Sequence, residues 1–265
     1  MALTDIRPTV RRRIVRLSTY AIFVALVVVV VLVANWPTIG RYFFNWSVAK
    51  TLWPTILRAA VNTIWYTLAA FVVGLVLAVV FALLKMSSGP FKWFAVGYIE
   101  LFRGLPALLT ILIMAFGLPM AFRGFRFPGG SVGGGLVALV IVTSAYTAEI
   151  IRAGIVAVPT GQREAARSLG MGSLRTTITI ILPQALRIVI PPLTNEFVTL
   201  LKDTSLLYIV GLTLFQKELT TFGKDGLSTY ASPTPLIAVA VMYLIITIPL
   251  TYLVSRLEKS MAVKK

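Results

Sequence analysis

Two acidic residues stand seven positions apart in an otherwise apolar segment, since Glu196 and Asp203 both lie within residues 186–212. A helix turns about 100° per residue, so this spacing returns the two carboxylates to within about 20° of the same face, two turns apart. If that face lines a pathway, the carboxylates can hold an α-ammonium group or a basic side chain by charge-assisted hydrogen bonds. Pro191 and Pro192 each lack a backbone amide donor, a pattern tolerated where backbone lines a cavity.

The alternative for Asp203 is structural, because it could pair with a lysine or cap Thr204 and Ser205. An anionic substrate would instead need cationic groups, for which Arg103 and Lys202 are available.

Two further pairs of opposite charge lie in apolar segments at i, i+3 spacing, namely Glu100 with Arg103 and Glu149 with Arg152. An ionised side chain near the bilayer centre costs about 2.5 to 3.5 kcal/mol on insertion scales, so each needs a partner, water or a function. The spacing predicts a local ion pair in both cases. Arg103 is also a candidate carboxylate binder, because a glycine and a proline follow it within three residues and loosen the helix.

The composition places these charges in a membrane protein. Of the 265 residues, 58% are hydrophobic and only 13% are charged, whereas soluble domains have about 25% charged residues. The absence of Cys and His excludes disulfides, thiolate or imidazole metal ligands, a Cys nucleophile and a His base. We therefore expect no catalytic residue and no metal site. The net charge of +16 is not arranged as a patch interleaved with aromatic residues, so we expect no nucleic-acid partner.

Six apolar segments are long enough to cross a bilayer as helices, which takes about 20 residues each, and they are too long for barrel strands. The sequence thus predicts an all-α membrane protein with six transmembrane helices, at residues 18–34, 60–84, 93–118, 134–157, 186–212 and 236–256.

Basic residues predict the orientation of these helices. The first span follows an arginine-rich segment without a convincing cleavage site, so it is interpreted as a retained anchor. Most Lys and Arg residues outside the spans fall on one side, which the positive-inside rule assigns to the cytoplasm together with both termini. Residues 158–185 are then a cytoplasmic loop. The glycine-rich residues 128–135 lack the Lys-Ser/Thr ending of a phosphate loop and are interpreted as an outer loop.

The cytoplasmic loop is unusually regular for a connector. QREAARSL supplies strong helix formers, Gly170 can adopt the positive φ that ends a helix, and a second helix can run from Ser173 toward Pro183. Small Ala165 and Ala166 would let another backbone approach closely. The pattern predicts a helical docking element for a cytoplasmic partner.

At this point the residues resemble a known family, the membrane subunits of bacterial type I ABC importers. The resemblance is carried by the loop motif Glu164, Ala165, Ala166, Gly170, Ile180, Leu182 and Pro183. It widens to the polar amino-acid uptake branch in YIELFRGLP at 98–106, AYTAEIIRAGI at 145–155, ILPQALRIVIPPLTNEF at 181–197 and LLKDTSL at 200–206.

The resemblance covers about residues 52–258. It implies an importer transmembrane domain at 51–260, built on a five-helix core with a coupling loop at 158–183. Residues 1–50 would add a basic cytoplasmic N-terminus, an anchor helix and an outer segment.

The resemblance implies partners and site residues as well. The chain would be the permease of a bacterial cytoplasmic-membrane importer for a polar amino acid, either glutamate or glutamine or a basic amino acid. It would assemble with a second permease, a dimer of ATP-binding subunits that bind ATP and Mg, and an extracellular substrate-binding protein. The docking residues would be Glu164, Ala165, Ala166, Gly170, Arg167 and Leu169, and the pathway residues Glu196, Asp203, Asn195, Thr199 and Arg103.

Two other functions compete with this interpretation. A secondary transporter or channel would use the same intramembrane acids without an ATPase, but the docking loop and the lack of an evident inverted repeat argue against it. An intramembrane aspartyl enzyme would need two converging aspartates, whereas the other aspartates, Asp5 and Asp225, lie outside the predicted spans.

Overall fold

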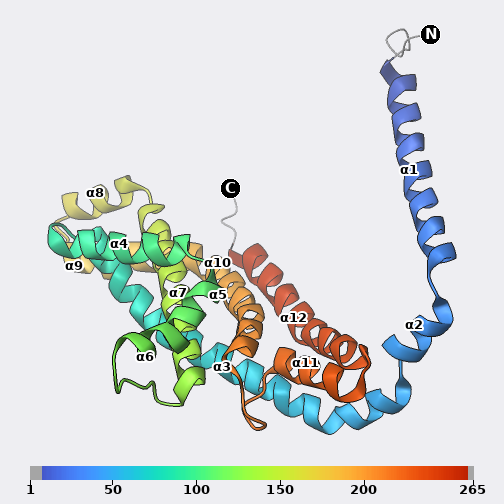
Figure 1. Cartoon of the computed structure of the whole chain (residues 1–265). Coiled ribbons are helices and arrows are strands. Elements are labelled where there is room, and N and C mark those ends of the chain that lie inside the picture. Colours follow the sequence, from blue (N-terminus) through green and yellow to red (C-terminus); the bar gives the residue numbers. More distant parts are fainter. Residues whose placement is uncertain (1–7, 262–265) are drawn as a thin grey trace.

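The computed structural model describes residues 8–261, which form helices joined by short connections (Figure 1). Residues 1–7 of the predicted N-terminal segment lie outside the described residues. No β-strand occurs between residues 8 and 261, and the all-α prediction is confirmed. The elements are α1 (Pro8–Val33), α2 (Trp36–Phe43), α3 (Trp46–Met86), α4 (Pro90–Gly104), α5 (Ala107–Leu112), the π-helix η2 (Ile113–Gly117), α6 (Leu118–Ala121), α7 (Gly130–Val156), α8 (Thr160–Ser168), α9 (Ser173–Thr176), the π-helix η3 (Thr177–Ile181), α10 (Leu182–Asp203), the 3₁₀-helix η4 (Thr204–Val210), α11 (Leu219–Tyr230) and α12 (Thr234–Met261).

Five helical segments among the described residues are long and apolar enough to cross a membrane, and a bent helix pair makes six if it counts as one span. The continuous helix predicted at 93–118 is wrong in shape, because α4 and the segment from Ala107 to Ala121 meet at a bend of 108°. Pro106 explains the break. Its ring disfavours helical geometry at the preceding residue, and Leu105 accordingly has φ −90° and ψ 140°.

Each of the two π-helices directly precedes a proline-containing helix start. The amide of Leu118 bonds to the carbonyl of Ile113 just before Pro119, and the amide of Leu182 bonds to that of Thr177 just before Pro183. A proline inside a helix removes a donor and clashes with the carbonyl four residues upstream, which a wider π-turn relieves. The second helix of the loop therefore does not end near Pro183 as expected but continues from α9 through α10.

Close packing in the bundle depends on small residues, as is usual where lipid supplies no hydrophobic drive between helices. Along the contact of α3 with α7, the buried residues include Ala70, Ala78, Ala138 and Ala148. The glycine-rich stretch differs from the expected loop, because α7 begins at Gly130 and the following glycines are helical.

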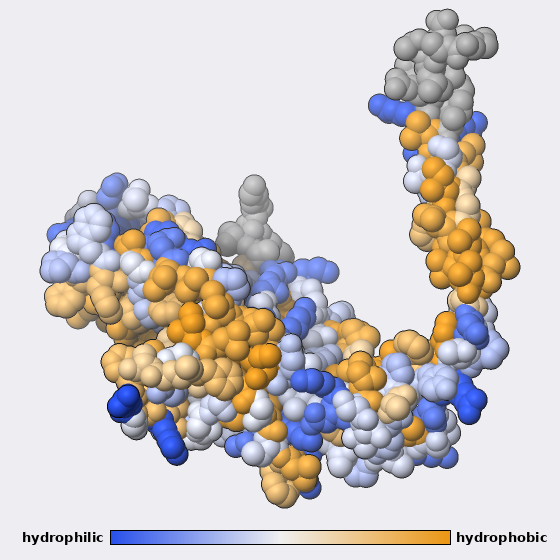
Figure 2. All heavy atoms as spheres, in the orientation of Figure 1, coloured by the Kyte–Doolittle hydropathy of each residue, from blue (hydrophilic) through white to orange (hydrophobic). Residues whose placement is uncertain are grey.

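α1 stands apart from the bundle in Figure 1, and none of its span Val15–Val33 is buried within the chain. Figure 2 shows hydrophobic side chains exposed along the visible face of α1. α2 links it to α3 across the end of the bundle. The first turn of α1, the end of α12 and α8 lie toward the top of Figure 1, whereas α2 and α11 lie toward the bottom. The bundle thus has an α8 end and an α11 end.

Candidate functional site: the α8 loop and the charges of the bundle

α8 is a short polar helix that ends in a tight glycine turn. The Gly170 amide donates to the carbonyl of Arg167 (2.9 Å), and the Met171 amide donates to that of Ala166 (3.1 Å). These two bonds make a Schellman motif, whose turn residue requires positive φ, and Gly170 has φ +79°. The structure therefore contains the predicted pair of helices joined by a glycine turn.

The base of this loop is closely packed. Val158, Ile181 and Ala185 form an apolar cluster between the ends of α7 and α10. A Cβ at Gly154 would lie 2.1 Å from Cγ2 of Val189, so α7 and α10 approach each other too closely for any larger residue there. The α8 loop is therefore attached to a closely packed contact between α7 and α10.

The two alanines of α8 face different surroundings. Ala165 is exposed, whereas Ala166 is only 5% exposed and packs inside the chain. This differs from the expectation that both alanines face a partner. The reason is that α8 contacts η3 with one face only, and the two alanines lie about 100° apart around the helix axis, so Ala166 faces the chain and Ala165 does not.

The outer face of the loop is polar with two large apolar side chains. Leu169 is 83% exposed and Leu174 is 75% exposed. Glu164 and Arg167 are exposed as well, and neither side chain has an ion-pair or hydrogen-bond partner within residues 8–261. An exposed leucine at a rigid helix end, flanked by unpaired charges, can bind a protein surface by apolar burial and ion pairing.

A network of four charges joins α3, α4 and α7 at the same end of the bundle. The Lys85 ammonium lies 3.2 Å from Oε1 of Glu100 and 3.0 Å from Oε2 of Glu149. Arg152 donates to Glu149 through Nη2 at 2.6 Å and through Nε at 3.1 Å, so this predicted i, i+3 pair is confirmed. Arg152 is four residues from the end of α7, which leads directly into α8. The network thus fixes the helix that carries the loop.

The predicted ion pair between Glu100 and Arg103 is not formed. Glu100 turns to Lys85 instead, and the Arg103 guanidinium lies 5.6 Å from the centre of the Tyr146 ring. The Tyr146 hydroxyl donates to the Arg103 carbonyl (3.2 Å), which holds the two residues together. Glu100 pairs with the distant Lys85 and not with its i, i+3 neighbour Arg103, because the Lys85 ammonium lies between two carboxylates and can neutralise both. The Arg103 side chain is exposed.

On α10, both predicted pathway acids are half-buried. Neither the Glu196 nor the Asp203 carboxylate has an ion-pair or hydrogen-bond partner in the described part of the chain, and Asp203 does not cap the following helix. The structural alternative for Asp203 is therefore not observed. Asn195 and Thr199 are exposed, with Asn195 donating to Oε1 of Glu258 on α12 (3.1 Å) and Thr199 to the Asn195 carbonyl (3.1 Å).

Another carboxyl group, that of Glu218, has no counterpart among the sequence predictions. It is completely buried at the start of α11, where it accepts hydrogen bonds from the amides of Thr220 (2.5 Å) and Thr221 (2.6 Å) and from the Thr221 hydroxyl (2.7 Å). Burial raises the pKa of Glu218 above its usual value, and these hydrogen bonds oppose that shift in part. Glutamate is not a preferred N-cap residue, so nothing in the sequence pointed to it. Residues 8–261 contain no group of three or more Asp or Glu side chains that could hold a metal ion.

Comparisons with known proteins agree with the geometry. Residues 74–263 match the family described as "Binding-protein-dependent transport system inner membrane component". The chain is 44% identical over 207 residues to the probable glutamine ABC transporter permease protein GlnM of Bacillus subtilis, covering 74% of this chain and 92% of the relative. It is 33% identical over 225 residues to the glutamine transport system permease protein GlnP of Escherichia coli K12, covering 83% and 99%. One solved structure, "Crystal structure of an amino acid ABC transporter with histidines", matches with a TM-score of 0.73 and 36% identity over 80% of this chain and 96% of that one.

Proposed function

Because the chain belongs to the family of binding-protein-dependent transport system inner membrane components, we propose that it is the permease through which an ATP-driven importer moves a polar amino acid into the cell. Among the substrates considered from the sequence, glutamine is supported by the two relatives, which are glutamine permeases. The α-ammonium group of glutamine, which every free amino acid shares, is a suitable partner for the unpaired carboxylates of Glu196 and Asp203 on α10.

The observation that carries the proposal is the rigid, outward-facing α8 loop. The exposed residues Glu164, Ala165, Arg167 and Leu169 form the docking face for an ATP-binding subunit, and Gly170 fixes its turn. The subunit's closure on ATP and Mg pushes on α8. Since α8 continues from α7 through a packed base, the displacement reaches α7 and α10 together instead of being lost in a flexible linker.

The remaining partners follow from the same proposal. A second permease, identical or related, completes the pathway, and an extracellular binding protein delivers the substrate at the α11 end. The α8 end faces the cytoplasm of a bacterial cell, where the sequence also predicts both termini. This orientation is supported by the distribution of basic residues.

The docking role is tested by charge reversal at Glu164. The permease is co-expressed with its ATP-binding subunit, and Glu164→Lys is compared with Arg123→Glu, a charge reversal at an exposed residue of the loop between α6 and α7. We expect Glu164→Lys to abolish copurification of the ATP-binding subunit at normal membrane levels of the permease, with no loss for Arg123→Glu. Normal copurification of the Glu164→Lys variant would remove the docking role.

The energy source is tested in proteoliposomes that contain the complete complex, the binding protein and radiolabelled glutamine. We expect accumulation only with ATP. Accumulation by the permease alone would instead identify a secondary transporter.

A further inference from the structure

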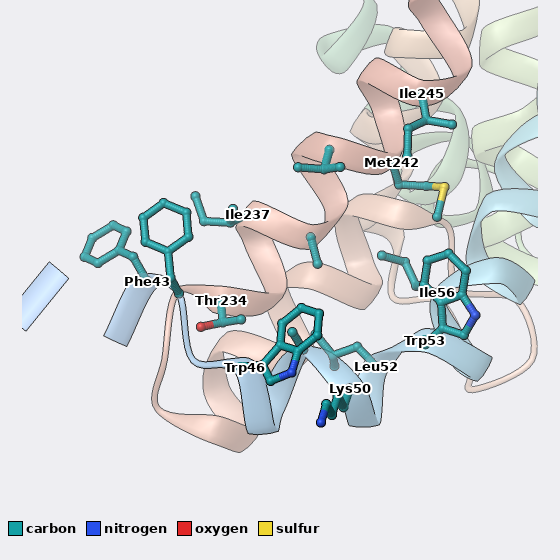
Figure 3. A pocket seen from close by; sticks show the side chains of 14 residues that line it. Phe43, Trp46, Lys50, Leu52, Trp53, Ile56, Thr234, Ile237, Met242 and Ile245 are labelled. Carbon is teal, nitrogen blue, oxygen red and sulfur yellow. The ribbon is translucent and has the colours of Figure 1, made fainter. Parts of the chain in front are cut away.

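A pocket of about 620 Å³ lies between the beginning of α3 and the first half of α12 (Figure 3), and α8 lies at the opposite side of the bundle in Figure 1. Its volume is typical of sites that bind small organic ligands, which enclose about 300 to 1,000 Å³. The lining is almost entirely apolar, and only Lys50 and Thr234 are polar. The lining contains a cation, Lys50, but no carboxylate for an α-ammonium group, so we do not assign this pocket to the transport pathway described above.

One end of the pocket is fixed by hydrogen bonds between side-chain hydroxyl groups and backbone atoms. The Thr234 hydroxyl donates to the Tyr42 carbonyl (2.9 Å) and accepts from the Asn45 amide (3.1 Å). The Ser232 hydroxyl donates to the same Tyr42 carbonyl (2.5 Å). These bonds connect the α2–α3 junction to the start of α12. They also engage the polar atom of Thr234, which leaves Lys50 as the lining residue able to bind a polar ligand group.

Lys50 lies at the edge of the pocket, and its side chain points away from α12 (Figure 3). Its ammonium lies 5.6 Å from the centre of the Trp46 ring and has no ion-pair partner within residues 8–261. Trp46 and Trp53 also line the pocket and are largely exposed. Tryptophan and lysine at the end of a membrane span are typical of the level of the lipid headgroups.

We propose that this pocket binds an anionic phospholipid, with one acyl chain between α3 and α12 and the phosphate at Lys50. The pocket lies between two segments that are apolar enough to cross a membrane, where lipid is the surrounding solvent, and α1 does not cover it, since the α1 span is unburied. Each methylene group transferred from water into such a site contributes about 0.8 kcal/mol. Because lipid tails are equally apolar in the bilayer, selection depends on the single uncompensated cation, which favours a headgroup without a positive charge of its own.

The proposal is tested by native mass spectrometry of the full chain, purified in mild detergent and incubated with phosphatidylglycerol or phosphatidylcholine of equal chain length. We expect one phosphatidylglycerol per chain to be retained, at least fivefold more than phosphatidylcholine. Ala238→Phe fills the pocket and Lys50→Gln removes its cation, so each should reduce retention of phosphatidylglycerol at least fivefold.

Two matched variants control for general effects on lipid binding. Val76→Phe adds the same ring at an exposed position on α3, and Arg123→Gln removes a cation from an exposed loop, so neither should change retention. Equal retention of the two lipids, or unchanged retention in Ala238→Phe, would overturn the proposal.

The other apolar occupant available on the chain is α1 of a second copy. The chain has no cysteine, so a cysteine pair at Ala238 and Val28 reports this contact directly. We expect no disulfide between copies in membranes that contain phosphatidylglycerol. Efficient crosslinking would show that α1 fills the pocket and would exclude the lipid.

Discussion

The carboxylate of Glu149 on α7 differs from the carboxylates on α10 in the presence of a cation. Glu149 is held by Lys85 and Arg152, whereas Glu196 and Asp203 have no ionic partner within the described residues. A buried charge without a partner is costly, and a helix gains nothing in stability from it. The difference separates a carboxylate that is paired within the bundle from carboxylates that we propose to bind a charged group of the substrate.

Breaking the paired network should have the largest effect. Glu149→Gln leaves Arg152 without an anion and leaves Lys85 with only the exposed carboxylate of Glu100, which costs about 3 kcal/mol for a mostly buried pair. We expect a clear drop in the thermal unfolding midpoint in detergent, measured by tryptophan fluorescence. Glu100→Gln is the control in the same network. The Glu100 side chain is 61% exposed, so its loss should cost less than about 1 kcal/mol. Equal destabilisation by both would contradict the central position of Glu149.

Neutralising an unpaired carboxylate on α10 should not lower the thermal stability of the protein. Glu196→Gln removes a half-buried charge with no partner, so we expect unchanged or higher thermal stability together with glutamine uptake lowered about tenfold, the equivalent of one charge-assisted hydrogen bond. Uptake in proteoliposomes is the measurement. Lys259→Gln, which removes an exposed charge at the end of α12, is the control and should transport normally. A Glu196→Gln protein that transports normally but unfolds earlier would reassign Glu196 to structure.

Glu218 represents a third case. Within the described residues its buried carboxylate has no cationic partner, but it accepts hydrogen bonds from neutral donors. Its pKa is raised in the folded chain, so the folded state binds the proton more tightly than the unfolded state does. Its contribution to stability is therefore greatest below its ordinary pKa of 4.5 and falls as the pH rises through the raised value. We expect Glu218→Gln to flatten the dependence of the unfolding midpoint on pH above 4.5. An unchanged pH profile would show that Glu218 does not cause it.

The sequence predicted what depends on local pattern and missed what depends on distant contacts. Gly170 was identifiable because a helix of strong formers ran into a glycine, and α10 because proline and acid spacing follow the helix period. The role of Lys85 could not be predicted in this way, since its two carboxylate partners are 15 and 64 residues away in the sequence. The pocket at Lys50 was equally hidden, because its walls come from α3 and α12, whose contact no periodicity encodes.

The smallest effect is expected at the turn of α8, where the positive φ of Gly170 sets the direction of the proposed docking face for the ATP-binding subunit. Gly170→Ala forces an L-residue to φ +79°, which costs about 1 kcal/mol and favours other turn geometries. Gly172→Ala is a matched control two residues away, since Gly172 has φ −63° and open space around it. We expect Gly170→Ala to weaken binding of the ATP-binding subunit about fivefold, measured by titration in detergent, and Gly172→Ala to leave it unchanged. Equal weakening by both would mean that the subunit contacts this segment directly and does not depend on the glycine's conformation.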